Sequence, residues 1–337
     1  MVTIKDIAEA CAVSRATVSK ALNGYSDINA QTAKLIRDKA NEMGYFPNMA
    51  ARSLKTNKTY NIGVVFSDEL RNGLKHEYFS SVLNSFKDEV EKKGYSITFL
   101  IPRAGEQGMT YREQCAYRNL DGVLIACANF DHEDVRELAT ADIPLVTIDY
   151  AFDSRSAVIS NNASGMQDLV SYICRKGHRR IAYIHGEKTP VTQKRLAGFH
   201  KGCESEGVNV DDELIIQARY RDAELAGRIT EELLNRPDRP TCILYPDDFA
   251  MIGGLNVIRN KGYRIPEDIS IAGYDGSYYS KLMSPVITTV KQNTNEIGYR
   301  AAKKLLEEIE SPKTCVAEVV MVSGELQKGE SVRSISL

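Results

Sequence analysis

From Asn61 onward, short apolar runs alternate with longer amphipathic segments, and this alternation constrains the fold more than any other feature of the chain. The apolar runs have the length of buried strands, and the longer segments repeat apolar residues at helical spacing. Elements that alternate in this way form parallel sheets covered by helices on both faces. We expect strands at NIGVVF, YSITFLI, DGVLIA, PLVTID, RIAYIHG, TCILYP and DISIAGYD, and helices near residues 76–93, 162–176, 190–206, 222–235, 247–261 and 293–310.

This alternating region covers most of the 337 residues. It is large for a single sheet of this kind, so we predict two α/β halves. Ligands of such folds bind outside the carboxyl ends of the strands or between two halves. The pattern therefore predicts a binding cleft in this part of the chain.

The first 45 residues have a different pattern, which predicts three short helices around a small core. Thr3 and Asp6 have the spacing of a capping box for the first helix. Ser14 can cap a second helix that runs from Arg15 to about Leu22. The third helix is expected from about Ala30 to Met43, with Gly44 as its terminator.

A tight Val-Ser turn separates the first two of these helices. Two helices of this length around such a turn are typical of a helix-turn-helix, in which the second helix lies in the DNA major groove. On periodicity alone, an ordinary helical hairpin that completes a core is an equally good interpretation.

Charge is distributed unevenly along the chain. The net charge is −2, yet residues 1–60 contain nine basic and five acidic residues. A basic N-terminal piece on an acidic body is what a nucleic-acid-binding head on a carrier domain would show. Residues 46–60 add basic side chains without an apolar core of their own, which indicates a linker or a short helix.

Several classes of protein are disfavoured by the sequence. No apolar run reaches the roughly 18 residues of a membrane span, and the N-terminus does not resemble a secretory signal. Seven dispersed cysteines without C-x-x-C spacing indicate reduced thiols in the cytoplasm rather than disulfides or a metal site. No nucleophile lies at a meaningful spacing from a base, and no phosphate-binding loop is present. We therefore expect no cofactor and no enzymatic activity.

Ordered motifs along the chain resemble one known family. The segments TIKDIAEACAVSRATVSKALNG and GYFPNMAARSLKTNKTYNIGVV, followed by KGHRRIAYIHG, KRLAGF, PEDISIAGYDG and SPVITTVKQ, are similar to the lactose/galactose repressor (LacI/GalR) family of bacterial transcription regulators. One departure is Ala12, where many members have glycine. Alanine fits that place if its φ is negative, so we expect no loss of function.

The resemblance implies a fold and a domain organisation. It implies an all-α helix-turn-helix head over residues 1–46, a hinge helix or linker over 47–60, and an α/β body that resembles a periplasmic binding protein with two doubly wound parallel-sheet subdomains. The N-terminal subdomain would comprise 61–160 and 291–323, and the C-terminal subdomain 161–290 and 324–337. Crossovers between them are expected near 160–162, 290–292 and 321–324.

The resemblance also implies the DNA contacts of the head. Arg15, Ala16 and Lys20 match the positions that read base edges. Arginine can pair in bidentate fashion with guanine, whereas alanine can only make an apolar contact, for example with a thymine methyl group. Phosphate contacts, which position the head without reading sequence, are implied for Thr3, Ser14, Thr17 and Asn23. For Ser14, a role as a pure helix cap is the alternative.

The hinge would supply a second DNA contact. In the family this segment becomes helical when two copies meet over the minor groove, and a leucine from each copy wedges into the central base step. Leu54 matches that leucine, and packing of Leu54 on the body is the alternative. An apolar wedge unstacks a base step and bends the duplex. The residues implied around the wedge are Asn48, Ala51, Arg52 and Lys55.

For the body, the resemblance implies an effector site. Arg195, Asp247 and Asp275 would hold adjacent hydroxyl groups in bidentate fashion, a geometry suited to a sugar. Asp149 is a plausible fourth polar contact. Phe79 and Tyr220 match aromatic positions that stack on effectors, although Phe79 can equally belong to the core.

These expectations together describe a cytoplasmic, sequence-specific repressor that binds a palindromic double-stranded DNA operator as a homodimer. A small effector, expected to be a sugar, would control it. The C-terminal SVRSISL has no leucine heptad, which favours a dimer over a tetramer. Three alternatives remain. The first is a catabolite-control type of regulator that docks a phosphorylated carrier protein. The others, less favoured, are a sugar-binding transport protein and an enzyme.

Overall fold

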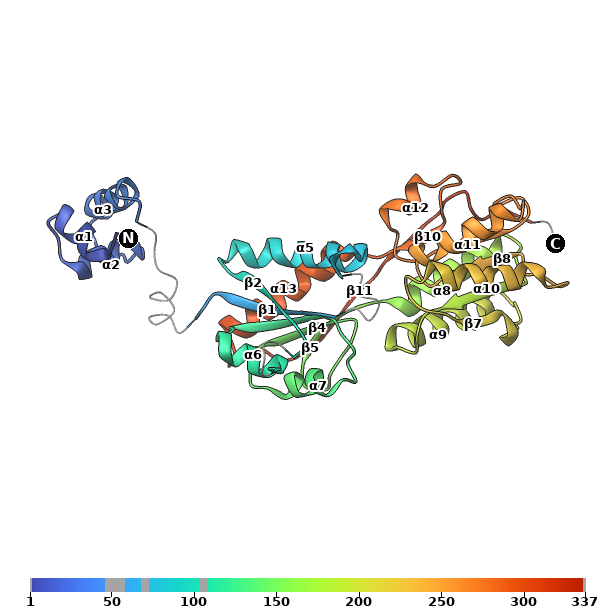
Figure 1. Cartoon of the computed structure of the whole chain (residues 1–337), viewed down its shortest axis with the longest axis horizontal. Coiled ribbons are helices and arrows are strands. Elements are labelled where there is room, and N and C mark those ends of the chain that lie inside the picture. Colours follow the sequence, from blue (N-terminus) through green and yellow to red (C-terminus); the bar gives the residue numbers. More distant parts are fainter. Residues whose placement is uncertain (1, 46–57, 68–72, 104–107, 336–337) are drawn as a thin grey trace. The chain divides into compact units, whose positions relative to one another are not determined.

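A computed structural model of the chain describes residues 2–45, 58–67, 73–103 and 108–335. The chain divides into two compact units, Met1–Thr59 and Tyr60–Leu337 (Figure 1). The first is all-α and the second is an α/β unit with parallel sheets. The predicted fold class, a helix-turn-helix head and an α/β body of parallel sheets, is therefore confirmed.

Three helices form the head, namely α1 (Ile4–Ala10), α2 (Arg15–Leu22) and α3 (Ala30–Glu42). The third ends one residue earlier than predicted, and Gly44 follows it with a φ of 67°, as a helix terminator requires. Each helix contributes buried apolar side chains to one small core. That core comprises Ile7, Ala8, Val18, Ala21, Ala33, Ile36 and Ala40.

Side-chain caps define where the head helices begin. The predicted capping box is present, since the Thr3 backbone N–H donates to Asp6 Oδ2 at 2.8 Å and the Asp6 N–H donates to Thr3 Oγ1 at 3.4 Å. At the second helix, the Thr17 N–H donates to Ser14 Oγ at 3.0 Å. Each cap satisfies a backbone donor that the helix itself leaves unpaired.

Ala12 differs from the expectation. Its φ is 51°, so the premise that alanine fits here with a negative φ is wrong. The chain turns sharply after α1, where the Val13 N–H donates to the Ala8 carbonyl at 3.0 Å, and a left-handed residue closes that turn. For a residue with a Cβ, the left-handed conformation costs about 1–2 kcal/mol.

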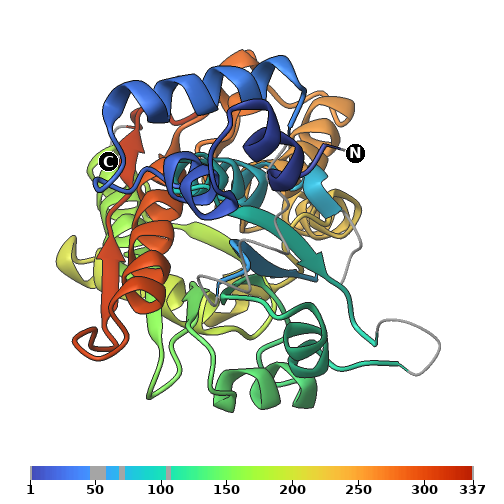
Figure 2. The ribbon, with the colours of Figure 1, turned by 90° about the vertical axis from the view of Figure 1, so that its left-hand side faces the viewer.

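One half of the body is a six-stranded parallel sheet in the order β11-β5-β4-β3-β1-β2. Its strands are β1 (Asn61–Phe66), β2 (Ser96–Leu100), β3 (Gly122–Cys127), β4 (Leu145–Ile148), β5 (Ser156–Ser160) and β11 (Val319–Val322). Helices α5 (Glu77–Lys92) and α13 (Thr294–Glu310) pack on one face. Helices α6 (Tyr111–Arg118) and α7 (Glu133–Thr140) cover the other face, and Figure 2 shows α7 and α13 on different sides of the sheet.

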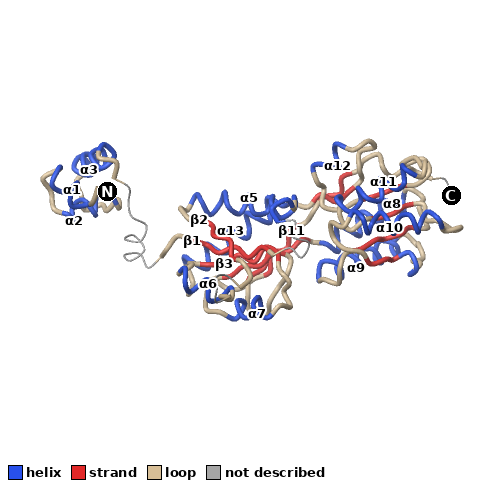
Figure 3. Tube along the Cα trace, in the orientation of Figure 1, coloured by secondary structure: helices blue, strands red, loops and turns tan. Residues whose placement is uncertain are grey.

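The other half is a four-stranded parallel sheet in the order β7-β6-β8-β9. Figure 3 shows strands in red among the helices of this half. Its strands are β6 (Ile181–His185), β7 (Ile215–Gln217), β8 (Cys242–Leu244) and β9 (Ser270–Ala272). Helices α8 (Asn162–Arg175) and α9 (Pro190–Ser205) cover one face, and α10 (Ala223–Asn235) and α11 (Asp248–Asn260) cover the other. Short helical turns complete the body: η1 (Gly73–Lys75), η2 (Asp212–Leu214) and α12 (Tyr278–Leu282).

Strands β10 (Thr289–Lys291) and β12 (Glu325–Gln327) form a separate antiparallel pair. The chain passes between the two sheets after β5, between β10 and α13, and between β11 and β12. All strands and helices predicted for the alternating region from Asn61 onward are present in the structure. The strands that the apolar pattern did not predict (β5, β7, β10, β11 and β12) have only three to five residues.

Candidate functional site

The outer face of α2 carries the side chains predicted to read DNA. Arg15, Ala16 and Lys20 are exposed, whereas Val18 and Ala21 on the same helix are buried in the head core. The helix therefore separates its packing side chains from its exposed ones. Lys20 forms an ion pair with Asp27, and this hydrogen bond raises the pKa of Lys20. A DNA group that binds Lys20 would compete with that carboxylate.

The side chains predicted to contact phosphate are also exposed or half-buried, and most of them cap helices. Thr3 and Ser14 begin α1 and α2, and Ser14 Oγ also lies 2.8 Å from Thr17 Oγ1. Asn23 ends α2, and its amide donates to the Ser19 carbonyl. A helix N-terminus favours phosphate through its free N–H groups and its dipole. For Ser14, a capping role is thus established, and a phosphate contact remains a prediction.

The hinge residues Asn48, Ala51, Arg52, Leu54 and Lys55 lie outside the residues that the structure describes. Their predicted DNA contacts remain predictions.

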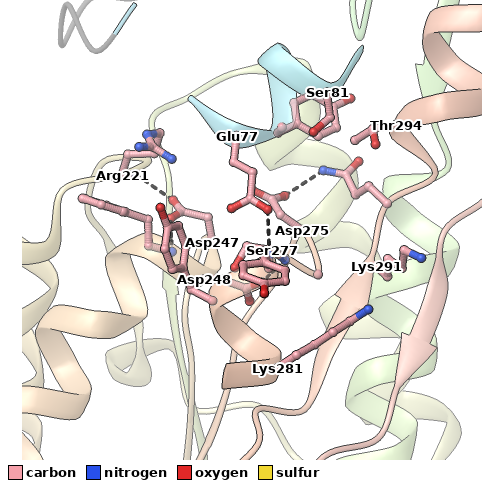
Figure 4. Close-up of a pocket in the computed structure, with 16 residues that line it drawn as sticks. Glu77, Ser81, Arg221, Asp247, Asp248, Asp275, Ser277, Lys281, Lys291 and Thr294 are labelled. Atoms are coloured by element: carbon pink, nitrogen blue, oxygen red, sulfur yellow. Dashed lines mark hydrogen bonds between the residues drawn. The ribbon is translucent and has the colours of Figure 1, made fainter. Parts of the chain in front are cut away.

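Within the body, a cavity of about 230 Å³ opens between the first turn of α5 and the loops around α11 and α12 (Figure 4). Residues of both halves form its walls, because α5 packs on the six-stranded sheet and α11 packs on the four-stranded sheet. The lining residues are Glu77, Tyr78, Ser81, Arg221, Asp247, Asp248, Phe249, Asp275, Gly276, Ser277, Tyr278, Tyr279, Lys281, Lys291, Gln292 and Thr294.

Asp247, a predicted effector residue, is both a wall of this cavity and the N-cap of α11. Its Oδ1 accepts hydrogen bonds from the N–H groups of Phe249 (2.9 Å) and Ala250 (2.7 Å). Its Oδ2 accepts one from the Arg221 N–H at 2.7 Å. Three of the roughly four acceptor positions of the carboxylate are therefore used by the protein itself.

Asp248, the next residue, is equally buried and was not predicted to bind the effector. Its carboxylate accepts from the Ser277 N–H at 2.7 Å and from the Thr289 hydroxyl at 2.8 Å. These bonds tie α11 to the loop before α12 and to β10. The acid pair in YPDDF was the sequence signal available, and both of its residues line the cavity, although the motif pointed only to the first.

Burial changes the acidity of this pair. It raises the pKa of Asp247 to about 6, with the charge of Asp275 adding to the rise and the Ala250 and Arg221 N–H groups opposing it. Burial, again reinforced by Asp275, raises the pKa of Asp248 well above its usual range. Both effects follow from removing negative charges from water and placing them near one another.

Asp275 lies on the cavity in a strained conformation, with a φ of 99°. Its Oδ1 accepts from Gln292 Nε2 at 2.7 Å and lies 3.6 Å from Arg195 Nη2. Backbone bonds from Asp275 N–H to the Val290 carbonyl and from Gln292 N–H to the Asp275 carbonyl hold it against β10. Its carboxylate keeps more free acceptor positions than that of Asp247.

Arg195, on α9, is 3% exposed and does not line the cavity. Its Nε donates to Asn162 Oδ1 and its Nη1 donates to the Pro246 carbonyl, both at 2.8 Å. The guanidinium also stacks on Tyr274, 3.6 Å from the ring centroid. Arg195 therefore lies behind the cavity wall and reaches it only through Asp275.

The other predicted effector residues also lie outside the cavity lining. Tyr220 donates to or accepts from Thr192 Oγ1 at 2.9 Å, and its ring lies 5.5 Å from the Arg195 guanidinium. Asp149 accepts a hydrogen bond from the Tyr78 hydroxyl at 2.6 Å, so it contacts a residue that lines the cavity without lining it itself. Phe79 packs edge-on against Phe66 in the core of the six-stranded half, which agrees with the alternative that it belongs to the core.

Two hydrogen bonds join the halves across the cavity. Glu77 Oε1 accepts from the Tyr278 N–H at 2.6 Å, and Arg221 Nη2 donates to the Lys75 carbonyl at 3.4 Å. In Figure 4 the carboxylates of Glu77, Asp247 and Asp275 lie between Arg221 and the ammonium groups of Lys281 and Lys291. Sequence reasoning missed Glu77 and Arg221, since neither belongs to a motif.

The described parts of the chain contain no group of three or more histidine, cysteine, aspartate or glutamate side chains arranged to hold a metal ion. In the same parts, no helix is long and apolar enough to span a bilayer.

Comparison with known proteins shows to which family the chain is related. Residues 3–48 match the family model "Bacterial regulatory proteins, lacI family", and residues 170–332 match "Periplasmic binding protein-like domain". The chain is 32% identical, over the whole of both chains, to the "Probable HTH-type transcriptional repressor ExuR" of Bacillus subtilis. It is 30% identical to the HTH-type transcriptional repressor PurR of Pasteurella multocida, over 99% of each chain.

Solved structures agree with these relatives. The lac repressor dimer bound to operator and the anti-inducer ONPF matches with a TM-score of 0.83 and 25% identity, over 98% of this chain and 99% of that one. The transcriptional regulator CelR in complex with cellobiose matches in fold, with a TM-score of 0.73 and 24% identity, over 98% of this chain and all of the other. The protein belongs to the lacI family of bacterial regulatory proteins and is a DNA-binding transcriptional repressor with a small-molecule effector, not an enzyme.

Proposed function

We propose that this repressor is a cytoplasmic homodimer on a palindromic operator and that a sugar bound in the body cavity controls it. The observation that carries the proposal is the cavity itself, in which carboxylates, hydroxyl groups and aromatic rings converge from both halves of the body. Its volume of about 230 Å³ lies below the roughly 300–1,000 Å³ of pockets for drug-sized ligands, which suits a molecule as small as a monosaccharide.

Asp275 and Glu77 are the acceptors best suited to sugar hydroxyls. Asp275 accepts one hydrogen bond from a side chain, and Glu77 accepts one from a backbone N–H, so both carboxylates keep free acceptor positions. Asp247 is largely occupied as a helix cap. Arg195 acts as a positioning residue, because it holds Asp275 from behind the cavity wall. Tyr220 and Asp149 would support the wall in the same indirect way.

Control of operator binding follows from the thermodynamic linkage between effector binding and the arrangement of the two halves of the body. A ligand that contacts both walls binds the closed arrangement of the two halves better, and it shifts their equilibrium by its difference in affinity. The Glu77–Tyr278 bond is one of the contacts that such closure makes or breaks. In our proposal, the movement changes the separation of the two hinges of the dimer, which decides whether the Leu54 side chains can meet in the minor groove.

A thermal-shift screen against a panel of monosaccharides tests the proposal. A true effector at 100 times its Kd adds about 2.7 kcal/mol to the free energy of unfolding. The hit is then titrated by calorimetry into the parent and into Asp275→Ala, which should bind about 2–5 kcal/mol more weakly. The matched control is Glu267→Ala, an exposed acid outside the cavity lining, which should bind like the parent. Operator affinity without ligand should be the same for all three.

A phosphorylated carrier protein that docks on the body is the competing regulator. If the sugar panel gives no stabilisation and a carrier of this kind co-purifies with the chain and changes its operator affinity, the sugar proposal is wrong. Size-exclusion chromatography with light scattering tests the dimer separately.

A further inference from the structure

Two buried polar atoms of cavity residues have no hydrogen-bond partner. They are Arg221 Nε, a donor, and Gln292 Oε1, an acceptor. An unpaired buried polar group costs about 1–3 kcal/mol, and more when the group is charged. Most buried polar groups in proteins are paired, so unpaired ones in residues that line a cavity need an explanation, and a bound ligand group would supply the missing partner.

Several contacts position Arg221 at the cavity wall. Its φ of 58° is unusual for a residue with a side chain, and its N–H is fixed by Asp247 Oδ2 at 2.7 Å. Its guanidinium lies over the Phe249 ring, 4.4 Å from the centroid. Strain at a site of this kind persists where the surroundings enforce it and is common in ligand-binding regions.

No described residue neutralises Arg221 by forming an ion pair with it. The nearest acid in the bonding network, Asp247, is already committed to three backbone N–H groups. The long Nη2 contact with the Lys75 carbonyl, at 3.4 Å, involves a neutral partner. A guanidinium with a free Nε–H edge is well suited to carboxylate and phosphate oxygens.

The orientation of Gln292 is set by its neighbour. Its Nε2 donates to Asp275 Oδ1 at 2.7 Å, so its Oε1 is the atom left without a partner. Gln292 is only 6% exposed, and water reaches this oxygen poorly. The free acceptor calls for a donor such as a ligand hydroxyl.

We propose that the effector is an anionic sugar, with a carboxylate or phosphate group bound by Arg221 and a hydroxyl group that donates to Gln292 Oε1. This inference rests on the proposed function, since it specifies the class of sugar in the same cavity. The ammonium groups of Lys281 and Lys291, which also line the cavity and have no ion-pair partner in the described ranges, offset part of the negative charge of the four carboxylates in the lining.

The test uses matched ligands that differ only at the sixth carbon. Glucose, galactose and mannose are each titrated by calorimetry into the full chain, together with the corresponding uronate and 6-phosphate. For at least one of the three sugars, we expect an anionic form to bind about tenfold or more tightly than the neutral sugar. The uronate and phosphate arms distinguish the two sources of negative charge.

Two variants identify the group responsible. Arg221→Gln should abolish the preference for the anionic form, so that the anionic and neutral forms of a sugar bind with equal affinity. Arg219→Gln, an exposed arginine two residues away that does not line the cavity, should keep the preference. Unfolding temperatures confirm that both variants fold.

The possible failures are distinguishable. If a neutral sugar binds as tightly as its anionic forms, the anionic proposal is wrong and the sugar proposal stands. If none of the nine ligands binds, both are wrong. If Arg221→Gln weakens neutral and anionic ligands equally, Arg221 only shapes the cavity, and the anionic proposal is also wrong.

Discussion

The head and the body place their functional side chains in opposite ways. In the head, α2 buries Val18 and Ala21 and exposes Arg15 and Ala16 on its other face, so packing and recognition use different residues of one short segment. In the body, the cavity joins groups far apart in sequence. Glu77 bonds to a backbone N–H that lies 201 residues further along the chain.

This difference has an energetic consequence. The exposed side chains of α2 can change without disturbing the seven-residue head core. In the cavity, Asp247 and Asp248 bind backbone and hydroxyl groups that hold the walls together, so the same carboxylates shape the site and stabilise the fold. A substitution in the head should therefore change either the stability of the head or its recognition of DNA. A substitution in the body cavity should change both stability and ligand binding.

The largest effect, complete unfolding of one unit, is expected from a change in the head core. Ile36 is fully buried, and Ile36→Ala should cost about 2–5 kcal/mol, enough to unfold a core this small. Operator binding should be lost, while the unfolding temperature of the body stays the same. Limited proteolysis of the full chain checks this, since only the head should become sensitive.

The matched control is Leu35→Ala, the adjacent residue, which is 57% exposed. It should keep the head resistant to protease. Equal operator affinity for Ile36→Ala and the parent would contradict the view that one small core supports the head.

Arg195 tests how far packing and recognition overlap in the body. Arg195→Ala removes a buried cation and leaves Asn162 Oδ1 and the Pro246 carbonyl without their donor, at a cost of about 3–5 kcal/mol to the body. The unfolding temperature of the body should fall, as measured by calorimetry. Lys194→Ala, the exposed neighbour, should leave it unchanged. An unchanged unfolding temperature with lost effector binding would instead make Arg195 a direct ligand.

Arg15 gives the corresponding test in the head. Arg15→Ala should weaken operator binding by about 1–3 kcal/mol and relax the preference for one base pair in each half-site, with no change in head stability. Titrations against the operator, single-base variants and random DNA measure the two effects. An equal loss on operator and random DNA would show that Arg15 contacts phosphate.

The smallest effect concerns the turn before α2. Ala12→Gly should stabilise the head by about 0.5–1 kcal/mol, because glycine adopts a φ near 51° without a Cβ clash. Ala10→Gly, in the exposed end of α1, should have the opposite sign and cost about 1 kcal/mol. Chemical denaturation followed by circular dichroism compares the two. A destabilised Ala12→Gly would show that the turn is not strained.

How much the sequence predicts depends on the range of the interaction. The caps at Thr3 and Ser14 were predictable because each bonds to a backbone group three residues away. The long strands and helices were predictable because apolar periodicity is local. The strand β7, with the sequence IIQ, is too short for any periodicity, and only its pairing with β6 makes it a strand.

The sequence by itself determined the helices of the head, the alternating elements of the body and, through its motifs, Asp247 and Asp275 as cavity residues. Only the tertiary structure decided the left-handed turn at Ala12, the burial of Arg195 behind Asp275 and the burial of Arg221 Nε and Gln292 Oε1 without a hydrogen-bond partner. The physical reason is that hydrogen-bond satisfaction depends on every neighbour in space. For Arg221 those neighbours come from η1, from α11 and from the N-cap of α11, which are remote in sequence.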